Sequence, residues 1–381
     1  MLSDPAFPEL IPDGQNMFRA VEFGLARPET WQAAAELILE LRYFIDHSGD
    51  WRPWQKLLQK ALARCGAEEV TLKIHLLDHS GHLYRRDRDW ESSLAAHREE
   101  ERLARELGRK DLLAQAHYNM ATLYWRQREY ETAANYSESA LAGFGEVGAT
   151  ERQMGGALTN AGLIDYGRGN YAAAVEAHSQ AAAHFRNTDF VVLLARSLIN
   201  LALAQEAAGE IEGAMTSYLE ARLILQQTGY EMEKARLELS LGTLLVNLGR
   251  SEEAEEAYLR AYSAYLKRSG HLYLQGLATN NLGHVYIEQG RFGEAETILR
   301  ESLAIWQRAN VGLQKANTTG SLAKALAAQG RTAEALSCYD EAIAGVSAFP
   351  DDGWARQLLG EFQQEKAELQ TKQIENGQAG E

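Results

Sequence analysis

The segment Leu277–Ala304 reads LATNNLGHVYIEQGRFGEAETILRESLA, and weaker copies of it fill most of the chain. It predicts a helix, a tight Gly-Arg turn and a second helix. The turn glycine recurs at steps of 40, 40, 41 and 40 residues, as Gly169, Gly209, Gly249, Gly290 and Gly330. Arg88 and Arg128 hold the same position upstream, and Gly49 lies 39 residues before Arg88. A fixed period of this length predicts a solenoid of stacked helical pairs.

The composition indicates an ordered chain with an acidic surface. Of the 381 residues, 45% are hydrophobic and 24% are charged, and the formal net charge is −15. A nucleic-acid-binding surface needs a basic stripe, so this charge argues against that role. No proline interrupts residues 54–349, which favours unbroken helices. We interpret Cys65 and Cys338 as reduced packing thiols.

The termini and the most apolar window bear on where the protein resides. The N-terminal stretch MLSDPAFPEL lacks a basic segment followed by an apolar core, so we expect no signal peptide and a cytoplasmic location. Phe190–Ala208 is the most apolar window, but it contains Arg196 and Glu206 and it keeps the repeat register. We therefore predict a buried helix there and no membrane segment.

The turn signals divide the chain into end segments and repeats. We expect an irregular N-terminal segment and short capping helix at 1–28, a solenoid at 29–349, and a capping helix and frayed tail at 350–381. The predicted repeats are about 29–65, 68–108, 109–148, 149–188, 189–229, 230–270, 271–310 and 311–349. Their second helices end at Gly or Asn residues suited to a left-handed conformation: Gly108, Gly148, Asn187, Gly229, Gly270 and Asn310.

The first predicted repeat and the tail are the least regular parts. Thr30 is placed to cap a helix at Trp31–His47, and a partner helix is expected at Trp51–Arg64. At the other end we expect Ile374–Glu381 to be frayed. Irregular first units are usual in solenoids, because end repeats have one neighbour and act as caps.

Small residues recur in the second helix of each repeat and predict close helix packing. One column holds Ala133, Ala174, Ala214, Ala254, Ala295 and Ala335, and a second, seven residues later, holds Ala140, Ala181, Ala221, Ala261, Ser302 and Ala342. Seven residues is two helical turns, so both columns share a face. Between them Tyr218, Tyr258, Leu299 and Tyr339 are expected in the core.

This pattern resembles the tetratricopeptide repeat family. The copy at 277–304 carries Leu282, Gly283 and Tyr286, then Ala295 and Ser302, in that family's order. The resemblance covers about residues 29–349 and implies an all-α, right-handed solenoid of about eight hairpins. The period of 40 departs from the commoner 34 and is similar to the subgroup found in kinesin light chain and bacterial sensor proteins. In such repeats the first helix of each pair lines the concave surface.

A column of asparagines lies on the predicted first helices. The position before Leu-Gly holds Asn119, Asn160, Asn200, Ser240, Asn281 and Ser321. Asparagine is a poor helix former, so its recurrence indicates a role beyond local structure. A primary amide donates and accepts together, as a peptide group does, so the column is suited to holding a peptide by its backbone. Peptide-binding members of the family use an asparagine in this way; the alternative is that each Asn bonds the adjacent repeat and sets the stacking.

A second constellation is basic and partly aromatic. His75, His79 and His82 share one helical face and are followed by Arg85 and Arg86; Trp125 and Arg126 continue the surface, with Arg196 and Arg236 further along. Within it, His79, Arg85, Arg86, Trp125 and Arg126 are our candidates for binding acidic groups of a peptide. Two alternatives stay open: a metal site built from the three histidines, and a merely solvated helix face.

No catalytic, phosphate-loop or metal-binding motif is present, so the sequence predicts no enzyme activity and no cofactor. The leading prediction is a scaffold that binds a segment of a partner protein in its concave groove, without nucleic acid or membrane. Gln15–Leu62, with Asn16-Met17-Phe18-Arg19-Ala20-Val21 and Gly49-Asp50-Trp51, is similar to the junction after the nucleotide-binding domain in bacterial STAND regulators. That resemblance implies an alternative: a ligand-sensing arm of, or acting with, a STAND signalling ATPase. Self-assembly through the end repeats is a further possibility.

Overall fold

The computed structural model describes residues 14–47, 51–267 and 270–378, and within these ranges the chain forms helices and no strands. This confirms the predicted all-α fold. The chain divides into two compact units, one ending at Ala208 and one beginning at Gly209. The division falls between the two helices of the predicted repeat at 189–229. None of the described helices is long and apolar enough to cross a membrane.

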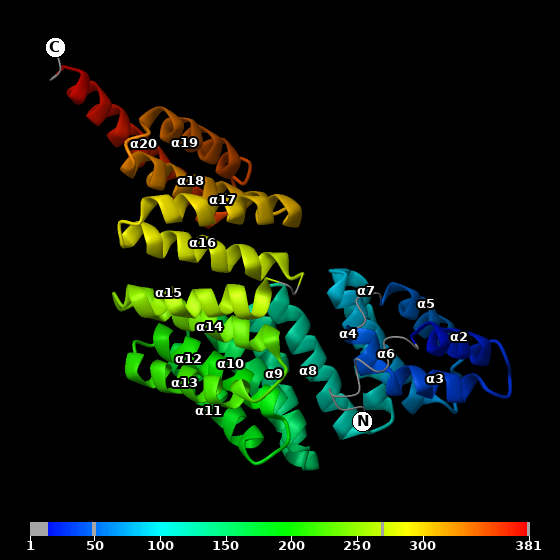
Figure 1. The fold of residues 1–381 in the computed structure, drawn as a ribbon. Coiled ribbons are helices and arrows are strands. Elements are labelled where there is room, and N and C mark those ends of the chain that lie inside the picture. Colours follow the sequence, from blue (N-terminus) through cyan, green and yellow to red (C-terminus); the bar gives the residue numbers. More distant parts are fainter. Residues whose placement is uncertain (1–13, 48–50, 268–269, 379–381) are drawn as a thin grey trace. The chain divides into compact units, whose positions relative to one another are not determined.

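The N-terminal unit is a succession of helices paired as the period predicts (Figure 1). Its elements are α2 (Gly14–Leu25), α3 (Trp31–Glu40), α4 (Arg42–His47), α5 (Arg52–Leu62), α6 (Val70–Arg86), α7 (Trp90–Glu106), α8 (Lys110–Arg126), α9 (Tyr130–Val147), α10 (Glu151–Gly167), α11 (Tyr171–Arg186) and α12 (Val191–Ala207). From α6 onward, each pair holds a first and a second helix of a repeat.

The C-terminal unit continues the alternation of first and second helices. Its elements are α13 (Ile211–Gln226), α14 (Glu231–Asn247), α15 (Ser251–Leu259), the π-helix η3 (Arg260–Leu266), α16 (Leu272–Glu288), α17 (Phe292–Ala309), α18 (Gly312–Ala328), α19 (Thr332–Ser347) and α20 (Gly353–Gln378). Figure 1 shows α16, α17 and α18 stacked in chain order.

The turn positions adopt the backbone conformation that the period requires. The five turn glycines have φ between 70° and 82°, and Arg88 and Arg128 reach 59° and 64°. A left-handed conformation is unfavourable for a residue with a Cβ, so the repeat geometry imposes it on these two arginines. The second helices also end left-handed at Gly108, Gly148, Gly270 and Asn310. The same prediction is wrong for Asn187, whose φ is −107°, and for Gly229.

The predicted small-residue columns form the packing seam of the repeats. Ala133, Ala174, Ala214, Ala254, Ala295 and Ala335 are fully buried, and the second column is equally inaccessible. The large residues between them rest on a glycine of the first helix: a Cβ on Gly242 would come within 2.6 Å of Tyr258, and one on Gly283 within 2.5 Å of Leu299. Glycine at this position lets the two helices approach closely.

The structure differs from the prediction at the ends. The expected helix Trp31–His47 breaks at Leu41, where the turn brings Leu41, Phe44 and Ile45 into the N-terminal core. Thr30 does not cap it; its hydroxyl donates to the Gly24 carbonyl at 2.9 Å. We expect a frayed tail from Ile374, yet α20 continues to Gln378, through Asn376 and Gly377, although both are weak helix formers. The predictions for residues 1–13, for Gly49 and for 379–381 lie outside the described residues.

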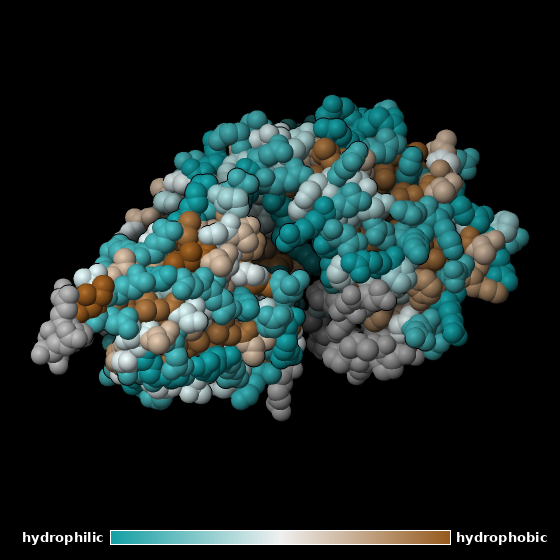
Figure 2. Space-filling view, turned by 90° about the horizontal axis from the view of Figure 1, so that it is seen from above, coloured by the Kyte–Doolittle hydropathy of each residue, from teal (hydrophilic) through white to brown (hydrophobic). Residues whose placement is uncertain are grey.

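Hydrophilic residues predominate on the face of the molecule that Figure 2 shows. In the view of Figure 2 the hydrophobic residues lie in separate patches surrounded by hydrophilic ones. Among the described residues, exposed large apolar side chains include Phe23, Leu223, Tyr273 and Ile374, which come from different helices. Single exposed apolar residues are normal on folded proteins and do not by themselves mark a functional site.

Candidate functional site

The asparagine column divides into satisfied and unsatisfied members. Asn119 and Asn160 are buried, with exposed fractions of 5% and 6%. The amide nitrogen of Asn160 donates to Thr122 Oγ1 of the preceding repeat at 3.1 Å. In the C-terminal unit Ser321, in the same column, lies with its Oγ 3.0 Å from His284 Nε2 of the preceding repeat. These members form hydrogen bonds between neighbouring repeats, which supports the stacking alternative for them.

Asn200 and Asn281 behave differently. Both are half-buried, on α12 and α16 respectively, and neither side chain makes a hydrogen bond within the part of the chain that the structure describes. An amide that is partly withdrawn from water and has no protein partner keeps its donors and acceptor available. These two positions, one in each unit, are therefore the members of the column able to bind an added peptide group.

Asn119 belongs to a buried polar cluster that joins four helices. Asp78 on α6 accepts from Arg42 Nη1 on α4 at 2.5 Å and from Asn119 Nδ2 on α8 at 2.7 Å. The same nitrogen lies 3.2 Å from Glu100 Oε1 on α7. Glu100 Oε2 is 2.8 Å from His97 Nδ1, and both of these side chains are inaccessible to solvent.

The environment of this cluster sets its protonation. Burial opposes ionisation of Asp78, but Arg42, His97 and Asn119 outweigh it and hold the pKa of Asp78 well below its usual range. Burial and the negative charge of Asp78 raise the pKa of Glu100 well above its usual range. Burial lowers the pKa of His97 to about 3. At neutral pH Asp78 is therefore the anion that Arg42 neutralises.

A second cluster surrounds Asp46 at the end of α4. His79 Nε2 and His82 Nε2 lie 3.6 and 3.4 Å from its Oδ1. Arg86 donates to the Asp46 backbone carbonyl at 2.5 Å, and its guanidinium lies 3.9 Å from the centre of the Trp51 ring. Burial lowers the pKa of His79, which is fully inaccessible. Arg86 is thus bonded to the Asp46 backbone, and His79, buried beside Asp46, is inaccessible to an added ligand.

Arg85 and Arg126 remain without an acidic partner. Arg85 Nη2 lies 2.8 Å from His82 Nδ1, and no described carboxylate pairs with Arg85 or with Arg126. Burial lowers the pKa of Arg85, and the nearby positive charge of Arg126 lowers it further. The Arg126 guanidinium lies 5.4 Å from the Trp125 ring, whose N–H donates to the Leu163 carbonyl at 3.2 Å. An oxyanion would be attracted to this pair.

The three histidines do not come together as a metal site. His75 is exposed, whereas His79 is fully buried beside Asp46 and His82 is half-buried. Among the residues described, no group of three or more His, Cys, Asp or Glu side chains is arranged to hold a metal ion. Arg196 and Arg236, also considered for the basic surface, are exposed on α12 and α14.

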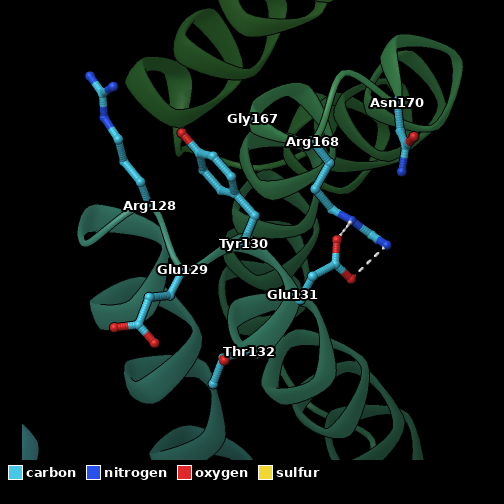
Figure 3. Close-up of a pocket in the computed structure, with 8 residues that line it drawn as sticks. All are labelled: Arg128, Glu129, Tyr130, Glu131, Thr132, Gly167, Arg168 and Asn170. Atoms are coloured by element: carbon cyan, nitrogen blue, oxygen red, sulfur yellow. Dashed lines mark hydrogen bonds and ion pairs between the residues drawn. The ribbon is translucent and has the colours of Figure 1, made fainter. Parts of the chain in front are cut away.

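A shallow cleft opens beside two successive turns of the N-terminal unit (Figure 3). Arg128, Tyr130, Glu131, Arg168 and Asn170 contribute to its lining. Arg168 binds both carboxylate oxygens of Glu131 at 3.0 Å, as the dashed lines in Figure 3 mark. Since that guanidinium and carboxylate satisfy each other, the cleft offers little charge to a ligand.

Sequence reasoning missed the Asp78–Glu100–His97 cluster. The signal that was available is the column of large residues resting on glycine, which begins upstream with His97 and His178. Their rings pack on Gly81 and Gly162, as Tyr258 packs on Gly242. A histidine in a column of core residues predicts a buried imidazole, which needs a polar partner.

Comparison with known proteins agrees with this architecture. Models of the tetratricopeptide repeat match residues 238–267 and 274–347. These segments are tetratricopeptide repeats, and the predicted resemblance is confirmed. A comparison with curated protein sequences gives no significant match.

Several solved structures share the fold at low identity. A STAND protein with a tetratricopeptide repeat sensor from Pyrococcus horikoshii is 14% identical, with a TM-score of 0.64, and the match covers 96% of this chain and 51% of that one. The apo quorum sensor NprR from B. thuringiensis is 14% identical, with a TM-score of 0.58, covering 90% and 99%. A Rap protein complexed with Competence and Sporulation Factor is 14% identical, with a TM-score of 0.53, covering 87% and 97%. At such identities the likeness shows the fold alone.

Proposed function

We propose that this chain is a non-enzymatic interaction module that holds a peptide segment of a partner protein against the first helices of its repeats. One observation carries the proposal. In a column whose buried members bond neighbouring repeats, Asn200 and Asn281 are half-buried and have no partner among the described side chains. A half-buried amide without a protein partner bonds water, and a bound peptide group can replace that water with both a donor and an acceptor.

The basic pair gives the proposed ligand a preferred charge. Arg85 and Arg126 lie in the last turns of α6 and α8 and pair with no carboxylate in the part of the chain that the structure describes, although the chain carries a net charge of −15. A glutamate or aspartate of the peptide would complete this pair with charge-assisted hydrogen bonds. Trp125 and Arg126 would form one wall of that subsite. Arg86, bonded to the Asp46 carbonyl, and His79, buried beside Asp46, would hold the helices in place behind it.

Selection from a displayed peptide library on the full chain tests this proposal. We expect the selected peptides to be enriched in acidic residues and to bind more weakly as salt rises, because exposed charges are screened. The double variant Arg85→Gln, Arg126→Gln removes both charges and should abolish the salt dependence. Matched variants Arg102→Gln and Arg105→Gln alter arginines already paired with glutamates on α7. Affinity that is equal at low and high salt would remove the electrostatic part of the proposal.

The sensor arm of a STAND-type ATPase is the second candidate function. It is supported by the agreement of 96% of this chain with roughly half of the Pyrococcus horikoshii protein, whose own description names a repeat sensor. A sensor changes shape on binding its ligand, whereas a scaffold has no such requirement. Small-angle scattering of the full chain with and without the selected peptide separates the two: a change in the radius of gyration favours the sensor.

A further inference from the structure

The buried cluster around Glu100 carries more negative groups than its cations neutralise. Asp78 and Glu100 both lie within hydrogen-bond distance of Asn119 Nδ2, and Arg42 is the one cation bonded to this cluster among the described residues. Arg42 contacts Asp78. Two buried carboxylates beside one guanidinium cannot both be ionised without an unpaired buried charge, which is costly.

The contact between Glu100 and His97 offers a place for a proton that removes the second buried charge. Glu100 Oε2 and His97 Nδ1 are 2.8 Å apart, which requires a hydrogen between them. Three arrangements place one there: a neutral acid beside a neutral imidazole, an anion beside an imidazolium, or an anion beside a neutral imidazole that carries its hydrogen on Nδ1. The third leaves Glu100 as a second buried anion beside Asp78, with Arg42 already bonded to Asp78, so burial disfavours it. The first two hold one titrating proton and have the same net charge. A second proton would add a cation beside Arg42, Arg85 and His82, the other positive or titratable groups that face His97.

We propose that the His97–Glu100 pair holds a single proton in the folded protein and that this proton keeps α7 packed against α6 and α8. His97 lies against α6, where a Cβ on Gly81 would be 2.5 Å from the ring. Glu100 reaches Asn119 on α8, and Asn119 reaches Asp78 on α6. When the pair loses this proton, Asp78 and Glu100 are both anions beside the Asn119 amide. Their repulsion opens the junction of α7 with α6 and α8. The device is independent of peptide binding.

Proton counting gives the pH dependence of the junction. When α7 opens, Glu100 and His97 return to ordinary pKa values of about 4.3 and 6.5. Between these values the open state also holds one proton, so the closed state gains or loses no stability with pH. Above about 6.5 the open state holds none and the closed state one, so the opening constant rises about tenfold per pH unit until the closed pair also loses its proton. Below about 4.3 the open state holds two, so opening is again favoured.

Hydrogen exchange of the α7 amides in the full chain tests this, with rates corrected for the intrinsic pH dependence of exchange. Glu100→Gln keeps the neutral shape and removes the titrating carboxyl. We expect the opening constant of the wild type, divided by that of E100Q, to rise about tenfold per pH unit above about pH 6.5. Glu101→Gln is the matched control at the neighbouring, more accessible position and should keep the wild-type slope. A ratio that is constant with pH would overturn the proposal.

Infrared spectroscopy of the wild type gives a second readout that does not depend on how well the variant folds. A buried protonated carboxyl, or an imidazolium hydrogen-bonded to carboxylate, has a band distinct from that of solvated carboxylates. The difference spectrum between about pH 7 and strongly alkaline pH should show the pair losing one proton on a native-like, helical chain. If Glu100 is a carboxylate and His97 is neutral at neutral pH, the proposal is wrong.

Discussion

The side chain that packs on a glycine of the first helix is polar in one repeat of the N-terminal unit and apolar in one repeat of the C-terminal unit. In the N-terminal unit the ring of His97 rests on Gly81, and in the C-terminal unit the side chain of Leu299 rests on Gly283 in the equivalent place. Leu299 is fully buried. His97 brings a buried nitrogen that bonds Glu100. The helix pair tolerates both because the glycine, not the chemistry of its neighbour, sets the distance between the helices.

Neighbouring positions follow the same division. Asp78 corresponds in register to Asn280, and Glu100 to Ser302. Asn280 Oδ1 accepts from Thr318 at 2.8 Å, a neutral bond where Asp78 has an ion pair. The family models match residues 238–267 and 274–347, a region with a buried charge of its own, because Glu238 pairs with Arg222 and Arg260. Charged side chains can therefore replace neutral core residues at a repeat junction when their hydrogen bonds and ion pairs satisfy one another.

Removing the buried anion should have the largest effect on this comparison. Asp78→Ala leaves Arg42 and Asn119 without their acceptor and should destabilise α6 and α8 by about 3 kcal/mol. The cost stays at the low end because the Arg42 side chain is 38% exposed and can turn toward water. Asn280→Ala, at the matched neutral position, should cost about 1–2 kcal/mol. Hydrogen exchange of α6 and α16 measures both; equal costs would contradict the contrast.

Filling the glycine contact should disturb both junctions alike. A Cβ on Gly283 would lie 2.5 Å from Leu299, so Gly283→Ala forces that side chain to move and should cost about 1–3 kcal/mol. Gly81→Ala should cost a similar amount by displacing His97. Gly293→Ala is the control, since nothing lies within 4 Å of its added Cβ. Chemical denaturation followed by circular dichroism measures these changes. If G283A has the same free energy of unfolding as the wild type, the glycine is not required there.

Acid should loosen the N-terminal junction through Asp78. Its pKa in the folded chain is depressed below the unfolded value of about 3.9, so the stability it contributes is present above that value. As pH falls below about 4 the unfolded chain binds a proton that the folded chain does not, and this stability is lost. Asn280 does not titrate. Exchange rates of α6 should therefore rise more steeply than those of α16 below about pH 4, and parallel profiles would contradict this.

The asparagine column should separate into two classes of variant. Asn119→Ala removes the donor shared by two buried carboxylates and should cost about 1–3 kcal/mol. Asn200→Ala and Asn281→Ala remove side chains without partners and should change stability by less than about 0.5 kcal/mol. Thermal denaturation of the three single variants checks this. If N200A or N281A is less stable than this, the asparagine at that position stabilises the stacking of the repeats.

Much of the fold could be read from the sequence because the repeat constrains each position many times over. The 40-residue period correctly placed the left-handed turns, including Arg88 and Arg128, and the buried alanine columns. The break at Leu41 and the π-helix at Arg260 escaped prediction. Both lie where local packing, rather than the period, decides the backbone, and hydrophobic spacing does not report such packing.

The candidate site could be predicted in outline but not in detail. The asparagine column was visible as a pattern, yet the pattern does not say which amides are satisfied. That depends on the residue one repeat away: Asn160 meets Thr122, whereas Asn200 meets no hydrogen-bonding side chain. In the same way, Arg85 and Arg86 look alike in sequence, and the position of Asp46 decides that Arg86 is engaged.

The most direct test of the proposed binding surface is nuclear magnetic resonance of the asparagine side-chain amides in the full chain, with and without a selected acidic peptide. The account predicts that the Asn200 and Asn281 amide signals shift on binding, while those of Asn119 and Asn160, bonded within the protein, and of exposed Asn135 on α9 stay in place. Saturable binding that shifts Asn135, or that leaves Asn200 and Asn281 unchanged, would contradict it and place the peptide elsewhere on the molecule.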